Sequence, residues 1–95
     1  MFLSRHGRLA QTYWETYRPT ALAALGPEQE QEAHFLELDA RIQARIGDLT
    51  EEMLVKLPDH EQVWARRAVR AQAQEIVYDE LVYLEKEPGT EHREM

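Results

Sequence analysis

The stretch that decides the fold is LTEEMLVKLPDHEQVWARRAV, residues 49–69, in which two helical patterns meet at Leu57-Pro58-Asp59. Proline ends a helix because it lacks an amide hydrogen and keeps the preceding residue out of the helical region. Asp59, with Gln62 three residues later, has the pattern of a capping box that starts a new helix. A connection of only a few residues makes consecutive helices antiparallel. The sequence therefore predicts a helical hairpin with its tip at Pro58.

Apolar side chains recur at helical spacing on both sides of this tip. Before it they are Phe35, Leu38, Ile42, Ile46, Leu49, Met53 and Leu57, and after it Ala65, Val69, Ala73, Val77, Leu81 and Leu84. The first series keeps its phase across Gly47, which a loop would seldom preserve, so we expect one helix over residues 28–57. The second series predicts a helix over residues 59–86.

Residues 1–26 are expected to form two shorter helices. The first presents Phe2, His6, Leu9, Tyr13 and Tyr17 on one face, with Ser4 as its cap and Pro19 as its end. The second occupies PTALAALGP, residues 19–27, and stops at its glycine. Residues 87–95 are expected to fray. The predicted fold class is thus an all-α single domain over residues 1–95, a helix bundle built on a long antiparallel hairpin.

Composition limits the function. The 95 residues have a net charge of −7 and include no cysteine, so one domain without disulfides, thiolate metal sites or a cysteine nucleophile is expected. No hydrophobic run is long enough for a signal peptide or a membrane helix, and we expect a cytoplasmic protein that does not enter the membrane. The acidic balance disfavours a dominant nucleic-acid role, because phosphate binding needs a basic surface.

No pattern in the chain predicts catalysis or a metal site. His60-Glu61 begins like a zinc-protease helix, but Trp64 stands where the second histidine is required. His34 has glutamates four residues before and three after it, yet the second long helix has no histidine to complete a di-iron site. There is no glycine-rich phosphate loop. We therefore predict a non-enzymatic protein without catalytic residues, metal or cofactor.

One basic cluster is the candidate patch for nucleic acid or a protein partner. It consists of Arg66, Arg67 and Arg70 on the second long helix, with Arg5 and Arg8 added if the first helix packs nearby. The alternative is that these arginines pair across the hairpin with Glu30, Glu32 or Glu37. The net charge favours the second interpretation, and the sequence leaves both open.

The segment EIVYDELVYLE, residues 75–85, predicts contact with a partner because it is apolar on more than one side. The two long helices also exceed what the short N-terminal pair can cover, so we expect a homodimer. The candidate interface residues are Trp14, Tyr78, Val82 and Tyr83. From their spacing, most of the aromatic residues are expected in the core, namely Tyr13, Trp14, Tyr17, Trp64, Tyr78 and Tyr83, and Trp64 also adds an aromatic side chain to the arginine cluster.

Three stretches together resemble the transposon-encoded TnpV-like family, small proteins of bacterial mobile elements. They are HGRLAQTYWETYRP (residues 6–19), HFLELDARI (residues 34–42) and VWARRAVRAQAQEIVYDELVY (residues 63–83). The resemblance implies residence on a mobile genetic element and implies no catalytic residues.

The expected function is therefore that of a small accessory protein that acts by protein–protein interaction. Its partner would be either the machinery of the element or a host defence complex, as in an anti-CRISPR or anti-restriction role. The alternative is a DNA-binding accessory or transcriptional regulator of transposition that uses Arg66, Arg67 and Arg70.

Overall fold

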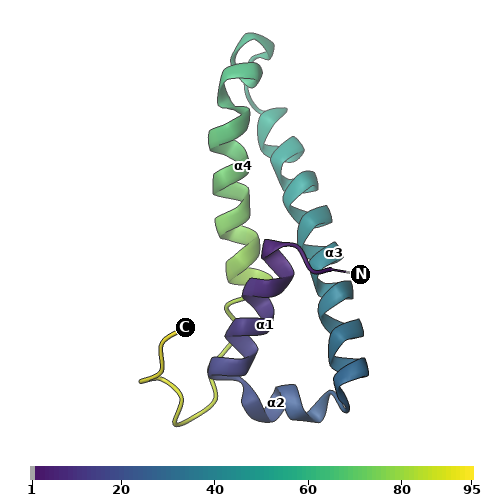
Figure 1. The fold of residues 1–95 in the computed structure, drawn as a ribbon. Coiled ribbons are helices and arrows are strands. Elements are labelled where there is room, and N and C mark those ends of the chain that lie inside the picture. Colours follow the sequence, from purple (N-terminus) through teal and green to yellow (C-terminus); the bar gives the residue numbers. More distant parts are fainter. Residues whose placement is uncertain (1) are drawn as a thin grey trace.

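The computed structural model describes residues 2–95, and the regular structure within that range is entirely helical. The helices are α1 (Arg5–Tyr17), α2 (Pro19–Ala24), α3 (Glu28–Leu54) and α4 (Asp59–Leu81). Helices α3 and α4 form an elongated antiparallel hairpin, and α1 lies along one half of it (Figure 1). The predicted fold class, a long hairpin with two shorter N-terminal helices, is confirmed.

Helix α3 runs through Gly47 without a break, as its apolar pattern predicted. Its predicted range of 28–57 was too long, because the chain leaves the helix after Leu54 and the Leu57 amide donates to the Leu54 carbonyl at 2.9 Å. The capping box at Asp59 was also wrong. Asp59 lies inside the first turn of α4, and Pro58 occupies the cap position.

Helix α4 ends at Leu81 rather than near residue 86. The amides of Val82 and Tyr83 both donate to the Tyr78 carbonyl at 2.8 Å, which closes the helix. Leu84 continues the apolar spacing because the chain after the helix also packs against the core, without being helical. Spacing alone does not distinguish these two situations.

The core lies where α1 meets the hairpin. It joins Tyr13, Trp14 and Tyr17 of α1 to apolar side chains of α3 and α4. The largest fully buried apolar side chains are Phe35, Ile42, Ile46, Leu54, Val77 and Val82. Each such side chain stabilises the fold by about 1.5–3 kcal/mol. The predicted inward face of α1 holds except at Phe2, which is 97% exposed.

A buried carboxylate ties the start of α1 to α3. The Ser4 amide donates to Asp39 Oδ2 at 2.5 Å and its hydroxyl to Oδ1 at 2.6 Å, while the same hydroxyl accepts from the His6 amide. The Gln43 side-chain amide donates to Asp39 at 2.9 Å. Burial opposes ionisation of Asp39, but the hydrogen bonds from Ser4 and Gln43 outweigh it and hold its pKa below the ordinary 3.8. The charged form of Asp39 is therefore part of the fold.

The C-terminal segment, residues 82–95, packs back onto the junction of α1 and α2. Helix α2 has no side-chain cap of its own, and the Glu87 carboxylate supplies one by accepting from the amides of Thr20 and Ala21 at 3.0 and 2.9 Å. Thr90 is 4% exposed and donates to the Tyr17 carbonyl at 3.2 Å. The expectation that residues 87–95 fray was therefore wrong.

Beyond α1, the hairpin consists of α3 and α4 alone. We call this part, residues 47–70, the distal arm (Figure 1). Its buried side chains are Thr50 and Leu54, both from α3, whereas Ala65 and Val69 of α4 are only half-buried. Among residues 2–95 no helix is long and apolar enough to cross a membrane.

Candidate interaction surface on the distal arm

Four of the five predicted arginines surround one hollow beside α4. This hollow, of about 600 Å³, is lined by Arg5, Val63, Arg66, Arg67, Arg70, Ala71 and Gln74, and we call it the arginine hollow. Its α4 residues recur at helical spacing and share one face of the helix. Arg5 reaches them from the start of α1, where its guanidinium donates to the Gln74 side chain at 3.0 Å. The predicted convergence of α1 and α4 arginines is thus present for Arg5.

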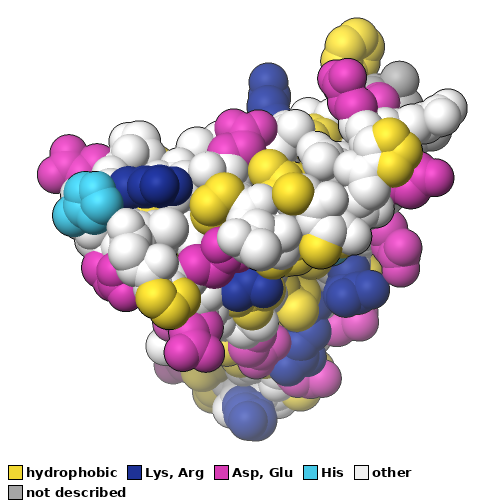
Figure 2. Space-filling model, turned by 90° about the horizontal axis from the view of Figure 1, so that it is seen from below, with side chains coloured by type: hydrophobic (Ala, Val, Ile, Leu, Met, Phe, Trp, Pro, Cys, Tyr) yellow, Lys and Arg dark blue, Asp and Glu magenta, His cyan; other side chains and the backbone are white. Residues whose placement is uncertain are grey.

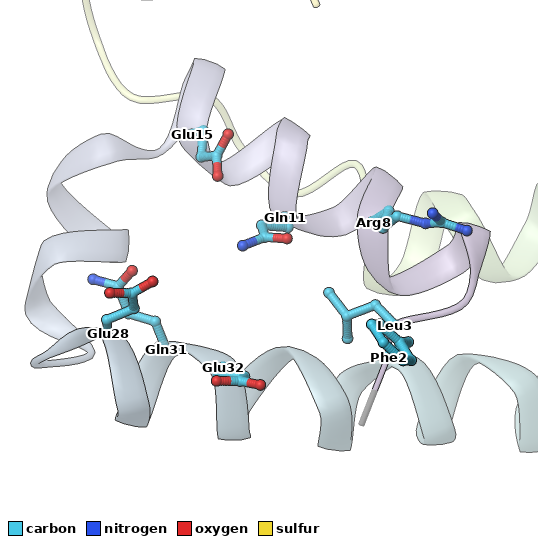
Figure 3. Close-up of a pocket in the computed structure, with 8 residues that line it drawn as sticks. All are labelled: Phe2, Leu3, Arg8, Gln11, Glu15, Glu28, Gln31 and Glu32. Atoms are coloured by element: carbon cyan, nitrogen blue, oxygen red, sulfur yellow. The ribbon is translucent and has the colours of Figure 1, made fainter.

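Arg8 is not part of this hollow. It lines a different one, of about 720 Å³, between α1 and the start of α3, together with Phe2, Leu3, Gln11, Glu15, Glu28, Gln31 and Glu32. Figure 3 shows its side chains spread along both walls, with carboxylates at one end and Arg8 at the other. Because the polar groups do not converge on one point, this second hollow is the weaker candidate site.

Among residues 2–95, only one of the three α4 arginines forms a salt bridge across the hairpin. Arg66 lies 2.7 Å from Glu51 of α3, and since both side chains are more than half exposed the pair stabilises the fold by about 0–1 kcal/mol. None of the three predicted glutamates is its partner. Within residues 2–95, Arg67 and Arg70 form no salt bridge. Their guanidinium groups face solvent and retain their hydrogen-bond donors for a ligand.

Large apolar side chains are exposed on the same arm. Val55 is 71% exposed, Val63 78% and Trp64 86%. The expectation that Trp64 lies in the core was wrong: its neighbour Ala65 is half-buried, and one residue along a helix turns the side chain by about 100°, which leaves Trp64 in solvent. Tryptophan and arginine are the residues most enriched at the energetic centres of protein interfaces. Their proximity makes the arm the best candidate surface of this chain.

The predicted interface residues lie mostly inside the chain itself. Trp14, Tyr78 and Val82 are between 0% and 9% exposed, so they are core residues rather than a docking surface. Within the chain, the second apolar side of α4 contacts α1 and the C-terminal segment. Tyr83, at 43% exposed, is the one predicted interface residue that solvent reaches. The homodimer stays a prediction.

A buried polar contact joins α1 to α4 below the arginine hollow. His6 Nδ1 and the Tyr78 hydroxyl are 2.6 Å apart, and both side chains are buried. Burial and the nearby Arg5 charge lower the pKa of His6 below 6.5, while burial raises the pKa of Tyr78 above 10. In the Nε2–H tautomer of the neutral imidazole the hydroxyl donates to Nδ1, and in the Nδ1–H tautomer the ring donates to the hydroxyl. This contact fixes the position of the α1 N-terminus and hence of Arg5.

The two histidines considered for metal or catalysis have other surroundings. His60 is at the tip of the hairpin, 82% exposed at its side chain and 3.9 Å from Glu61. His34 packs its ring against Trp14, with 4.9 Å between ring centroids. Residues 2–95 contain no group of three or more His, Asp or Glu residues placed to hold a metal ion.

The end of the molecule opposite the arm has a mixed surface. Figure 2 views the chain from that end and shows hydrophobic side chains in small separate groups, with acidic and basic side chains among them. Here the C-terminal segment covers α1, and Lys86 lies 4.0 Å from the Tyr17 ring centroid. This arrangement contrasts with the concentration of arginine and exposed apolar side chains on the arm.

The chain was compared with protein-family models, with curated proteins and with solved structures, and none matched. The resemblance to the TnpV-like family therefore stays a prediction from the sequence. The candidate surface depends on the geometry of the arm alone.

Proposed function

We propose that the protein is a non-enzymatic accessory protein of a mobile genetic element that acts by binding another protein through its distal arm. The observation that carries the proposal is the exposure of Trp64 on an arm that α1 does not cover. The assignment to a mobile element rests on the sequence resemblance. Element machinery and host defence complexes are the two partner classes that this setting suggests.

The arm has the physical properties of a binding surface. Burying Val55, Val63 or Trp64 against a partner would stabilise the complex by about 1.5–3 kcal/mol each. Because these residues stand on α4 or on the turn that follows α3, their backbone is already ordered and little conformational entropy is lost on binding. Exposed aromatic side chains beside arginines are typical of such surfaces.

Affinity capture from the native host tests the proposal. The immobilised chain is compared with Trp64→Ala, and we expect the variant to lose the partners that the unaltered chain retains. Phe2→Ala is the matched control, because Phe2 is an equally exposed aromatic residue outside the arm. Circular dichroism establishes that both variants fold. Identical partner sets for the unaltered chain and Trp64→Ala would refute a role for the arm.

DNA binding is the second candidate, favoured by the convergence of Arg5 with the three α4 arginines. Four phosphate contacts would give a slope of about −3.6 for log affinity against log salt concentration, since each contributes about −0.9. A titration with duplex DNA at two salt concentrations separates the candidates. Tight binding with that slope, lost in Arg67→Ala/Arg70→Ala, would replace the first proposal.

A further inference from the structure

We propose that the arginine hollow docks an acidic α-helical segment of the partner protein, lying along α4 beyond the N-terminus of α1. The inference deepens the proposed function, on which it rests, by naming what the arm recognises. It is independent of Trp64, which lies on α4 but is not among the residues that line the hollow.

The charge of the hollow selects an acidic ligand. Guanidinium groups bind carboxylates through paired hydrogen bonds that are stronger than neutral ones. Arg66 already has Glu51 as a partner and Arg5 has Gln74, so Arg67 and Arg70 have the most donors left for a ligand. Val63 and Ala71 add apolar surface between the charges. A segment with carboxylates and small apolar side chains on one face matches this lining.

The α4 face explains why the ligand is helical. Residues 67, 71, 74, 78 and 82 follow one stripe at helical spacing along α4. Its lower part, Tyr78 and Val82, is already covered within the chain, and His6 of α1 contacts Tyr78 directly. The upper part lies beyond the end of α1 and is open. A helix from the partner would lie along the stripe that His6 of α1 already contacts at Tyr78.

The dimensions of the hollow agree with a short helix. Its α4 lining runs from Val63 to Gln74, which corresponds to about 16 Å at 1.5 Å per residue, or three helical turns. Arg67 and Arg70, the two arginines without a salt bridge, are three residues apart on α4 and are neighbours on its surface. Carboxylates at positions i and i+4 of a docked helix are spaced similarly, about 6 Å apart, so two acidic residues one turn apart can meet two arginines.

Neighbouring carboxylates disfavour a wider polyanion. Glu51 of α3 borders the hollow through its contact with Arg66, and Glu61 and Glu75 lie on the adjacent face of α4, at helical spacing with Trp64. A DNA duplex spreads its phosphates across a major groove about 12 Å wide, which would bring some of them against these carboxylates. A single helix, about 10–12 Å in diameter, confines its acidic stripe to the hollow.

The test measures fluorescence anisotropy of four labelled probes against the full chain. The probes are a helical peptide with glutamates at i and i+4 on one face and alanine and leucine beside them, its lysine counterpart, an unstructured polyglutamate of equal charge, and a duplex DNA. We expect binding of the acidic helix only. In Arg67→Glu/Arg70→Glu its affinity should fall at least 10-fold. Arg8→Glu/Arg41→Glu changes charge equally outside the hollow and should have less than a 3-fold effect.

The outcomes are distinct. Equal binding of the polyglutamate coil would overturn the requirement for a helix, and tighter binding of the duplex would overturn the ligand class. If no probe binds while partner capture still depends on Trp64, this inference fails and the proposed function stands. If partner capture does not depend on Trp64, the proposed function itself is refuted. If the Arg67→Glu/Arg70→Glu variant does not fold, Arg67→Ala/Arg70→Ala replaces it, and its affinity for the acidic helix should fall at least 3-fold.

Discussion

The same substitution at two helical glycines should have opposite effects on stability. Gly7 lies in the first turn of α1, and Gly47 lies in the interior of α3. Alanine is favoured over glycine inside a helix by about 0.8–1 kcal/mol. A Cβ added at Gly47 would meet no atom within 4 Å, so Gly47→Ala should gain about that amount in free energy of unfolding.

At Gly7 the same methyl group has no room. Its Cβ would lie 2.9 Å from Asp39 Cβ, from Asp39 Oδ2 and from Leu3 Cδ2. Asp39 Cβ is fixed to the α3 backbone, so α1 would have to move away, and overpacking of this kind costs about 1–3 kcal/mol. Displacing the carboxylate also weakens its charged hydrogen bonds from Ser4. After the gain in helix propensity, we expect a net loss of about 1–2 kcal/mol for Gly7→Ala.

Thermal and urea unfolding monitored by circular dichroism measure the difference. For a domain of this size about 1 kcal/mol corresponds to 4–8 °C in melting temperature. Gly47→Ala should melt higher than the unaltered chain and Gly7→Ala lower. Equal stabilisation by both would refute the close packing of α1 on Asp39. Destabilisation by Gly47→Ala that depends on protein concentration would instead show that another subunit covers α3 at Gly47.

Three further predictions concern the buried polar groups, the C-terminal segment and the arm. The folded-state pKa values of His6, Asp39 and Glu87 are all lowered. Stability should therefore decrease below pH 6.5, where the unfolded chain binds a proton at His6, and again below about 4.5, where Glu87 and then Asp39 are protonated. In Asp39→Asn the second decrease, followed by urea unfolding against pH, should be smaller. Removing residues 87–95 should lower the melting temperature, because α2 loses the cap that Glu87 supplies. Glu87→Gln should lower it by part of that amount. An unchanged melting temperature would mean that the segment is not docked in solution. Trp64→Ala should change the free energy of unfolding by less than about 0.5 kcal/mol, since the side chain is 86% exposed, and a larger loss would place it in a contact within the chain.

The hairpin could be predicted from sequence because its determinants are local. Proline at the tip and an apolar stripe that keeps its phase across Gly47 specify two long helices, and both are present. The helix ends were less accurate. Leu84 is apolar because the chain packs on the core after α4 has ended, and periodicity registers burial but not backbone conformation.

The candidate surface could be predicted only in part, because only part of it is determined by local spacing in the sequence. Arg66, Arg67 and Arg70 cluster through their spacing on one helix, which the sequence shows directly. Whether Arg5 or Arg8 joins them depends on how α1 ends against α4, and only Arg5 lies beside Gln74. No local signal indicates such a contact.

The C-terminal segment illustrates the limit most clearly. Glu87 caps a helix that begins 68 residues earlier in the chain, at Pro19, and nothing in the acidic, glycine-containing sequence around it distinguishes a docked segment from a frayed one. The missing side-chain cap of α2 is the one clue, because uncapped amides at a helix start require an acceptor. This segment and α1 also cover one side of α4, which explains why Tyr78 and Val82, predicted for an interface, are core residues.

Net charge alone is a poor guide to what this chain binds. Of its 11 lysines and arginines, four line one hollow, and the remaining seven share the rest of the surface with 18 acidic residues. At physiological salt, charges farther apart than the Debye length of about 8 Å are screened from one another. A partner is therefore little affected by the distant acidic surface, and the contacts within the hollow would decide the affinity of the proposed complex. The acidic surface around the hollow would then determine selectivity. It repels a broad polyanion such as duplex DNA, but not a narrow acidic helix that fits within the hollow. An acidic protein with a small basic surface is in this way suited to recognise one stripe of carboxylates on a protein partner, as proposed, and to discriminate against nucleic acid.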